Sequence, residues 1–349
     1  MKYRLMSHLA CPACRSTRLA LETRRTETRP VCTGHFEPEE TDIPGVDLSR
    51  REEIEVLEGA IHCKDCAAIY AIREGVPRML LPGSDEGPES AHRWTSFDSA
   101  HPEWEENFLE LSAPLRARDF LGKLVLDAGC GFGRHAYFAA RFGAEVIAMD
   151  ANGDAIASAL ANTRSLERVH LVQGDLQHPP FRDDLFDIVL SFGVLHYLES
   201  PTPALDALSG VLRPGGRYSI WVYGPRQGVA LSMTNAVRGV STALEPEELY
   251  RVSQGIATGL RIFSHTPYRF LQKVPVAGAI VSHLPVHDHH KWPFKVVVAD
   301  VYDRLRHPIK HWFTSEELEV WFGDRGFADV SVSRRVRNNE SFMATGIRR

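Results

Sequence analysis

The feature that most constrains the fold is a glycine-rich loop between a short apolar run and a helical pattern. The run 124–126 leads into Asp127-Ala-Gly129-Cys-Gly131-Phe-Gly133, and helical spacing begins at Arg134. Glycine lets the chain turn tightly and lets a ligand approach the main chain. In α/β sheets, turns of this kind bind nucleosides and phosphates at the carboxyl ends of the strands. The loop therefore predicts a parallel sheet with a ligand site at that edge.

Strand and helix patterns alternate on either side of this loop. Further strands are predicted at 145–149, 169–172, 186–191, 217–223, 330–335 and 341–347, and helices at 134–142, 153–165, 205–212 and 315–322. Such alternation is typical of a parallel sheet that is covered by helices on both faces. The expected fold class is α/β, a doubly wound, Rossmann-like sheet of seven strands.

Composition and the alternation of predicted strands and helices divide the chain into parts. Residues 82–88 have the composition of a linker, since they combine glycine, proline and charge without an apolar period. Residues 224–311 interrupt the alternation with helices predicted at 233–244, 246–258 and 268–274. Because the sheet is completed only afterwards, we interpret 224–311 as an inserted helical lid. The expected parts are a small module at 1–82, a sheet domain at 89–223 and 312–349, and the lid.

Composition also excludes several classes of protein. Forty Lys and Arg against forty-five Asp and Glu give a net charge of −5, so no net positive field attracts nucleic acid or anionic lipid. The longest weakly polar stretch, 274–286, is shorter than the ~18–20 residues that span a bilayer. Residues 1–10 lack the apolar segment of a signal peptide. We expect a cytoplasmic protein with no membrane partner, with nucleic acid disfavoured and a homodimer left open.

The residues around the loop indicate what it binds. A dinucleotide fingerprint needs Gly or Ala where Arg134 stands, and Asp127 would repel a diphosphate but suits an ammonium group. Asp150, which ends the next predicted strand, can accept hydrogen bonds from ribose hydroxyls, and Asp175 can accept one from an adenine amine. S-adenosylmethionine has this shape and charge. The alternative for Asp127 or Asp175 alone is a helix N-cap.

The chain resembles class I S-adenosylmethionine-dependent methyltransferases of the type 11-like group. The resemblance lies in motifs that follow in the same order, at 125–134, Asp150, 174–175, 186–196 and 212–216. The resemblance implies that Asp127 and the loop glycines lie by the methionine moiety, and that Ser191 and Phe192 line the methyl donor's pocket. The cofactor-binding residues expected on this basis are Asp127, Gly129, Gly131, Gly133, Arg134, Asp150, Ala151, Asp175, Leu176, Ser191 and Phe192.

Two CxxC pairs in the N-terminal module offer four thiolates, Cys11 and Cys14 with Cys63 and Cys66. Four thiolates in two such pairs are typical of a closed, structural zinc site. The surrounding sequence resembles small zinc-ribbon methyltransferase activators, but 48 residues separate the pairs, so a charged loop or hairpin is expected at about 24–58. The alternatives are a ribbon that has lost its metal, or Cys32 or His62 as a substitute ligand.

Residues beyond the fourth predicted strand are candidates for catalysis. His196, and Tyr223 at the end of the fifth strand, lie where substrate would meet the cofactor, and a histidine there can take a proton near neutral pH. Equally open for His196 is a packing role, as a polar residue that caps the floor of the crevice. His287–His290 is either a metal or base cluster or a solvated loop.

Apolar segments of the lid, 262–263, 277–281 and 296–298, favour a small and fairly apolar substrate that is methylated at O or N. Two other hypotheses remain open at this point. The first is methylation of RNA or of a translation factor, with the zinc ribbon as a docking module. The second is a non-catalytic scaffold that binds the cofactor.

Overall fold

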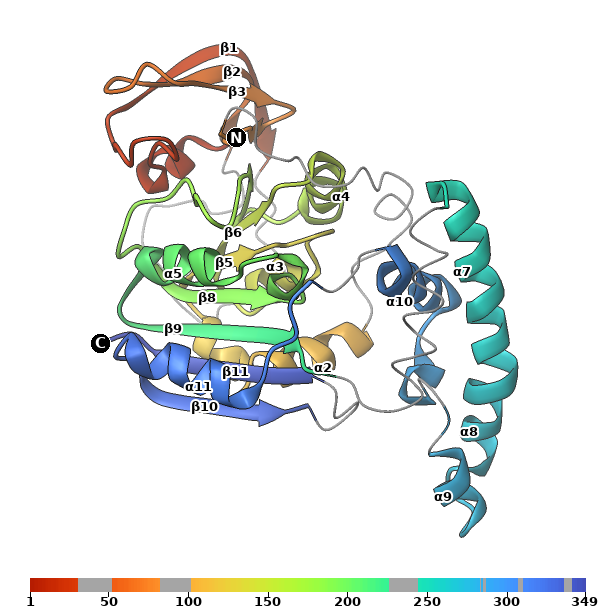
Figure 1. Cartoon of the computed structure of the whole chain (residues 1–349). Helices are drawn as coiled ribbons and strands as arrows, with labels where there is room; N and C mark the ends of the chain where they lie inside the picture. Colours follow the sequence, from red (N-terminus) through yellow and green to blue (C-terminus); the bar gives the residue numbers. More distant parts are fainter. Residues whose placement is uncertain are drawn as a thin grey trace, which may run out of the picture.

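The computed structural model describes residues 1–30, 52–81, 102–225, 244–282, 284, 287–306, 310–335 and 341–349. Its strands form one sheet of four strands and one of seven. Figure 1 shows the small sheet above one edge of the large sheet, with a column of helices standing beside the domain. No helix in the described ranges is long and apolar enough to cross a membrane. The predicted linker at 82–88, Cys32 and nearly all of the helix expected at 233–244 lie outside the described residues.

The small sheet is an antiparallel meander whose first two strands are long. β1 (Leu19–Pro30) pairs with β2 (Glu52–Cys63) along their whole length, and β3 (Ile69–Arg73) and β4 (Val76–Pro77) complete the sheet. A short 3-10 helix, η1 (Tyr3–His8), precedes it. The described part of the charged segment between the two cysteine pairs thus forms the arms of a hairpin, which is one of the two forms expected for it.

The large sheet has the strand order β10-β11-β9-β8-β5-β6-β7. Strands β5 to β9 are parallel to one another, whereas β11 is antiparallel to both β9 and β10. The seven-stranded, doubly wound sheet predicted from the sequence is confirmed. The strands are β5 (Leu124–Ala128), β6 (Glu145–Asp150), β7 (Val169–Gln173), β8 (Phe186–Phe192), β9 (Leu212–Tyr223), β10 (Ala328–Arg334) and β11 (Ser341–Ile347).

Helices cover both faces of this sheet and create two apolar cores. Alternate side chains of β5 enter different cores, Val125 on one face and Leu126 on the other, as the two-residue period of a strand requires. The first face packs against α2, α3 and α4 and the second against α5 and α11. The elements are α2 (Pro102–Leu111), η3 (Ala117–Phe120), α3 (Arg134–Arg141), α4 (Gly153–Thr163), η4 (Leu195–Tyr197), α5 (Thr202–Val211) and α11 (Ser315–Asp324).

Further helices lie between β9 and α11 in the sequence, and we call 246–306 the helical insertion. Its first three segments form one continuous column with a π-helical turn, and its last helix packs against the first. Val296, Val297 and Val298 are buried and join the core beside α2 and α3. The segments are α7 (Pro246–Leu260), η5 (Arg261–His265), α8 (Thr266–Leu271), α9 (Ala277–Val281), η6 (His287–Lys291) and α10 (Phe294–Arg306).

The small module is joined to the large sheet at the edge strand β7. Arg78, which follows β4, pairs in parallel with Gln173 of β7, and the Met79 N–H donates to the Gln173 carbonyl at 2.8 Å. The module also shares an apolar core with the sheet domain, in which Leu9 and Met79 lie with Phe181. The segment after β4 therefore covers an edge that would otherwise expose unpaired backbone groups.

Candidate functional site

The glycine-rich loop between β5 and α3 is too tightly packed for larger residues. Gly129, Gly131 and Gly133 all have positive φ, at 81°, 54° and 82°. A Cβ atom on Gly129 would lie 2.7 Å from the Val194 side chain, and one on Gly133 would lie 3.1 Å from Ala159. Only glycine meets both demands without strain, so this spacing of glycines has a physical cause in the fold.

Asp127 lies beneath this loop and is 1% exposed. Its Oδ2 accepts a hydrogen bond from the Ala136 N–H at 2.9 Å, whereas its Oδ1 is buried and has no hydrogen-bond partner among the described residues. Burial raises the pKa of the Asp127 carboxyl to about 7, and the nearby charge of Asp150 adds to the rise. An ammonium group beside Oδ1 would supply the missing partner and favour the ionised carboxylate. This orphaned atom fits the amino-acid tail of S-adenosylmethionine.

Asp150 ends β6 and fastens the loop to the sheet. Its Oδ2 accepts from the Gly131 N–H and its Oδ1 from the Asn152 N–H, both at 2.9 Å. The residue is half-buried. Each carboxylate oxygen can accept more than one hydrogen bond, so Asp150 can hold the loop and still accept from a ligand's hydroxyls. The next residue, Ala151, accepts a hydrogen bond at its carbonyl from the Gln173 side chain at 2.8 Å.

Asp175 follows β7, at the same end of the sheet. Its Oδ1 accepts from the Gln177 N–H at 3.0 Å, and its Oδ2 lies 2.8 Å from Nδ1 of His178. Leu176 is buried in the core that the module shares. The bond to Gln177 closes a turn and is not a helix N-cap, because no helix begins at 175–180. The N-cap of α3 is Gly133, and Asp127 reaches the first turn of that helix from the end of β5. Because β5, β6 and β7 are adjacent parallel strands, these acids lie at or just past carboxyl ends along one edge of the sheet.

Ser191 and Phe192 end β8, the strand beside β5. The Ser191 hydroxyl is fully buried and has no hydrogen-bond partner in the described ranges. Phe192 meets the His135 ring edge-on with centroids 5.2 Å apart. The carboxyl ends of β5 and β8 flank the point where the strand order reverses, which is where open α/β sheets bind ligands.

His196 and Tyr223 are brought together, with ring centroids 4.6 Å apart. His196 is fully buried, and its Nδ1 accepts a hydrogen bond from the Tyr223 N–H at 3.4 Å. In a neutral imidazole with this bond the lone pair on Nδ1 is engaged and Nε2 carries the proton. The geometry therefore favours the packing role over that of a general base.

Arg134 has a role that the sequence did not reveal. Its guanidinium carbon lies 4.0 Å from the centre of the Trp104 ring, and Trp104 in turn lies 5.0 Å from Trp292 of the helical insertion. An arginine over an indole face is a favourable cation–π pair. The glycine loop is thus connected to α2 and to the insertion through packed side chains. Trp104 and Trp292 stand 188 positions apart in the sequence, so only the tertiary fold could pair them.

The four cysteines converge as the sequence predicted. The Cys11 and Cys66 sulfurs are 3.6 Å apart, as are those of Cys14 and Cys63, and all four lie within 4.8 Å of one another. With zinc–sulfur bonds of about 2.3 Å, a tetrahedral site has sulfurs about 3.8 Å apart. The Tyr70 hydroxyl lies 3.1 Å from the Cys11 sulfur. The donor set fits zinc.

Other candidate ligands do not converge in the part of the chain that the structure describes, where the four cysteines are the one group of this kind. His62 pairs with Glu22 at 2.9 Å instead of completing the thiolate centre. In the histidine run, His290 meets the carbonyl of His287, and His289 stacks on Trp292. These contacts argue against a metal or base cluster, and the buried His289 shows that the run is not a fully solvated loop either.

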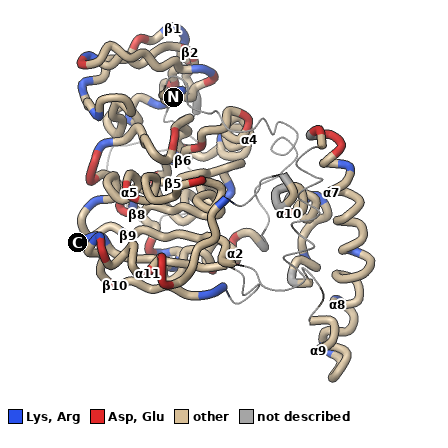
Figure 2. The backbone as a smooth tube through the Cα atoms, in the orientation of Figure 1, with Lys and Arg blue, Asp and Glu red and all other residues tan. Residues whose placement is uncertain are grey.

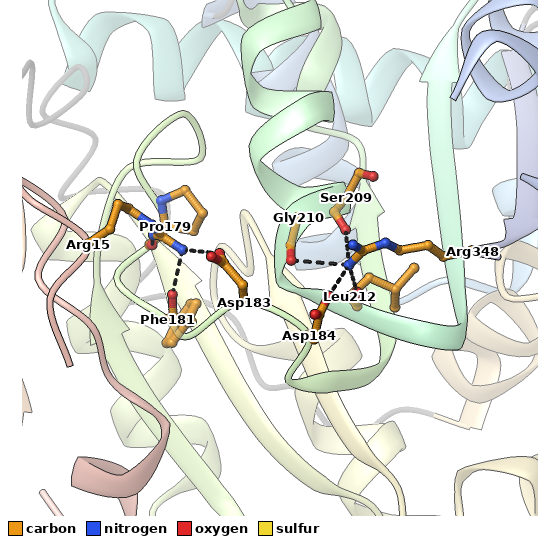
Figure 3. A network of polar contacts seen from close by, with 9 residues as sticks. All are labelled: Arg15, Pro179, Phe181, Asp183, Asp184, Ser209, Gly210, Leu212 and Arg348. Atoms are coloured by element: carbon orange, nitrogen blue, oxygen red, sulfur yellow. Dashed lines mark hydrogen bonds and ion pairs between the residues drawn. The ribbon is translucent and has the colours of Figure 1, made fainter. Parts of the chain in front are cut away.

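The cysteine knuckle contacts the segment that follows Asp175. Arg15, next to Cys14, donates hydrogen bonds to the Pro179 and Phe181 carbonyls at 2.7 and 2.8 Å and pairs with Asp183 at 2.6 Å (Figure 3). On the neighbouring turn, Arg348 binds Asp184 and the carbonyls of 209, 210 and 212. Nothing in the sequence identified Arg15, because its partners lie some 165 residues away.

Two family models match this chain. Residues 126–220 match the model of a methyltransferase domain, and residues 2–75 match the model of Trm112p-like proteins. The first match spans the glycine loop and the acids at the ends of β5, β6 and β7. The second spans both cysteine pairs. Both resemblances predicted from the sequence are confirmed.

Individual relatives match over parts of their length. An uncharacterized protein of Synechococcus sp. is 26% identical over 77% of this chain and 60% of its own. Demethylmenaquinone methyltransferase of Clavibacter sepedonicus is 37% identical over 28% of this chain and 40% of its own. "Probable tRNA methyltransferase 9B" of Mus musculus is 30% identical over 40% of this chain and 31% of its own. The chain thus spans between about a third and three fifths of the length of these relatives.

Among solved structures, magnesium protoporphyrin IX methyltransferase from Synechocystis PCC 6803 with bound SAH is similar at a TM-score of 0.41 and 15% identity, over 71% of this chain and 82% of that one. The family matches, the seven-stranded sheet and the convergent cysteines agree with one another. The chain therefore carries a class I S-adenosylmethionine-dependent methyltransferase domain that is preceded by a Trm112p-like domain with a four-cysteine centre.

Proposed function

We propose that the protein transfers a methyl group from S-adenosylmethionine to O or N of a small, fairly apolar molecule. The observation that carries the proposal is the set of three acids at or just past the carboxyl ends of the adjacent strands β5, β6 and β7, with the glycine loop between the first two. Bound S-adenosylmethionine would supply a methyl group that is already activated on a sulfonium. The protein then has to align donor and acceptor and to exclude water.

Each residue of the site has a proposed part in this reaction. The Asp127 carboxylate, through Oδ1, would receive the ammonium group of the cofactor, Asp150 the ribose hydroxyls and Asp175 the adenine amine. Ser191 and Phe192 would line the space beside the sulfonium. We assign His196 and Tyr223 to the wall of the acceptor site, because the Nδ1 atom of His196 is occupied by the Tyr223 N–H.

The module is proposed to hold a structural zinc ion through Cys11, Cys14, Cys63 and Cys66. Four thiolates complete a tetrahedral shell and leave no open coordination position, so the ion would stabilise the module and take no part in methyl transfer. Support comes from the spacing of the four sulfurs within 4.8 Å.

The alternative substrate class is RNA or a translation factor. One matching relative bears the name of a probable tRNA methyltransferase, and the N-terminal domain matches Trm112p-like proteins. The net charge of −5 argues against tight binding to a polyanion. Retention of tRNA in an electrophoretic mobility assay at physiological salt would favour this class over a small molecule.

Calorimetric titration tests the cofactor site. We expect S-adenosylmethionine to bind at micromolar concentration, and Asp150→Ala to weaken binding at least a hundredfold because it removes both the ribose acceptor and the anchor of the loop. Asp324→Ala, at the exposed end of α11, is the matched control and should bind as the wild type does. Equal affinity in Asp150→Ala would reject the site assignment. Cofactor binding without methyl transfer to any component of a lysate would favour the scaffold hypothesis.

A further inference from the structure

The first helix of the insertion leaves two large apolar side chains exposed, although Leu249 on the same helix is fully buried. On α7, Ser253 and Ala257 are fully buried, whereas Val252 and Ile256 are 41% and 37% exposed. A helix that only packs on a protein core places its large apolar residues inside and its small or polar residues outside. Val252 and Ile256 depart from this arrangement, so part of the outer side of α7 exposes apolar surface to water.

The same outward apolar surface continues along the column. In η5 and α8, Ser264 and His265 are buried, whereas Phe263 and Phe270 are 75% and 73% exposed. Figure 1 shows α7, α8 and α9 as a column at the margin of the molecule, with α10 between α7 and the sheet domain. Ten of the fifteen large apolar side chains that are exposed among the described residues belong to 252–294. They are Val252, Ile256, Ile262, Phe263, Phe270, Leu271, Val274, Val276, Ile280 and Phe294.

The charge of this stretch is of one sign. Residues 249–287 contain no Asp or Glu, although about five would be expected at the average of the whole chain, and they contain four basic residues. Arg251, Arg269 and Lys273 are exposed beside the apolar side chains. In Figure 2 the acidic residues of the column are confined to the beginning of α7. Arg251 pairs with Glu247 of the first turn of α7 at 3.7 Å, so Arg269 and Lys273 carry the basic character of the surface. An apolar surface with these basic residues is complementary to a surface that is both apolar and anionic.

We propose that the outer surface of α7–α9 docks on an anionic membrane surface, with Phe263, Phe270 and Val276 entering the acyl boundary and the basic residues facing the lipid headgroups. Helices with this composition lie in the plane of the interface without spanning it. The net charge of −5 belongs to the whole chain, but charges farther away than about 10 Å are screened at 0.1 M salt. The inference replaces the sequence-based expectation of no membrane partner.

A second copy of the chain is the other candidate occupant, and the charges argue against it. A two-fold interface places the same surface against itself, so the exposed Arg269 and Lys273 of one copy would approach those of the other, whereas the acidic residues of the column lie only at the beginning of α7. An anionic bilayer supplies the missing negative charge. It would also deliver an apolar acceptor from the lipid phase, a consequence that rests on the proposed function.

Vesicle flotation with the full chain tests the proposal. Vesicles of phosphatidylcholine with about a third phosphatidylglycerol should bind the protein at low salt, and vesicles of phosphatidylcholine alone should bind it at least tenfold more weakly. The double variant Phe263→Glu/Phe270→Glu should lose at least ten-fold in binding. Val320→Glu is the matched control, since Val320 is 59% exposed on α11 outside the insertion, and it should bind as the wild type does. Arg269→Ala/Lys273→Ala should weaken binding and flatten its salt dependence.

Several results would overturn the proposal. Equal flotation of Val320→Glu and the double variant would do so, as would absence of binding to both kinds of vesicle. Concentration-dependent self-association in the ultracentrifuge that Phe263→Glu abolishes would assign the surface to a second copy. Calorimetry with S-adenosylmethionine on each variant reports whether the sheet domain is intact, and so separates failure of docking from failure of the proposed function. If the double variant does not fold, Val276→Glu, at a side chain that is 77% exposed, replaces it.

Discussion

The N-terminal module and the helical insertion both lie outside the large sheet, but they differ in how far their apolar side chains are exposed to solvent. Leu9 and Met79 of the module are fully buried in a core shared with Phe181 of the sheet domain. In the insertion, Phe263 and Phe270 are about three quarters exposed. The apolar side chains of the module thus belong to the core of the sheet domain. Those on the outer surface of the insertion contact solvent and are available to a partner outside the chain.

The two additions also contact the cofactor edge differently. The module holds the segment after Asp175 through directional bonds from Arg15 to main-chain carbonyls. The insertion reaches the glycine loop through packed rings, with Trp292 tilted against Trp104 and the Arg134 guanidinium over the Trp104 face. Hydrogen bonds to fixed carbonyls specify a single geometry, whereas ring packing tolerates small displacements. We therefore expect the module to position the cofactor and the insertion to accommodate the acceptor.

The largest expected effect comes from removing the metal. Cys63→Ser, or chelation of the wild-type protein, should lower the unfolding temperature of the whole protein by about 10 °C or more, because the module would unfold and expose the shared core. Calorimetric scans with parallel zinc analysis check this. Cys130→Ala changes a buried cysteine outside the centre and should keep its zinc. An unchanged unfolding temperature in the metal-free protein would show that the module is held by its apolar core alone.

A smaller loss of stability is expected at Arg15, which follows the first cysteine pair. Arg15→Ala removes three hydrogen bonds to the 179–183 segment and should cost about 1–3 kcal/mol of unfolding free energy, since the side chain is 41% exposed and partly screened. It should also weaken cofactor binding severalfold. Arg18→Ala is the matched control, because Arg18 is 70% exposed and pairs with Asp65 of the same module. Equal cofactor affinity in the two variants would show that the module does not position that segment.

The smallest effect on the unfolding free energy is expected for a substitution on the exposed surface of the insertion. Phe263→Ser should change the unfolding free energy by no more than about 0.5 kcal/mol, because the ring is already in water. Val297→Ala, a smaller change at a fully buried position of α10, should cost about 2 kcal/mol. Urea unfolding curves measure both. A larger loss for Phe263→Ser than for Val297→Ala would mean that the exposed surface packs within the protein, and the comparison would fail.

Much of the architecture could be predicted because strong local patterns coincide with elements. The strand predicted at 341–347 matches β11, and the glycine loop at 127–133 connects β5 and α3. Prediction was weaker where tertiary contacts override local signals. Strand β9 begins at Leu212, five residues before the predicted start, and includes Pro214, Gly215 and Gly216. The helix predicted at 268–274 is α8, which continues from α7 through η5 and ends at Leu271.

The candidate site divides in the same way. Glycines, acids and paired cysteines are visible in the sequence because their chemistry depends on residue type and local spacing. The sequence does not show the partners of Arg15 and Arg134, the hydrogen bond to Nδ1 of His196 or the exposure of Phe263. Each of these depends on which distant segment packs against the residue.

For this protein, the sequence by itself determined the order of strands and helices along the chain, the glycine loop of the proposed cofactor site and the set of four thiolates. These follow from backbone conformation and side-chain chemistry, which act over a few residues. Only the tertiary structure decided which side of the insertion faces water and that Asp127 retains an oxygen without a hydrogen-bond partner in the part of the chain that the structure describes. Burial is a property of the whole packed chain, and the same apolar side chain contributes to stability inside the core and becomes a contact surface outside it.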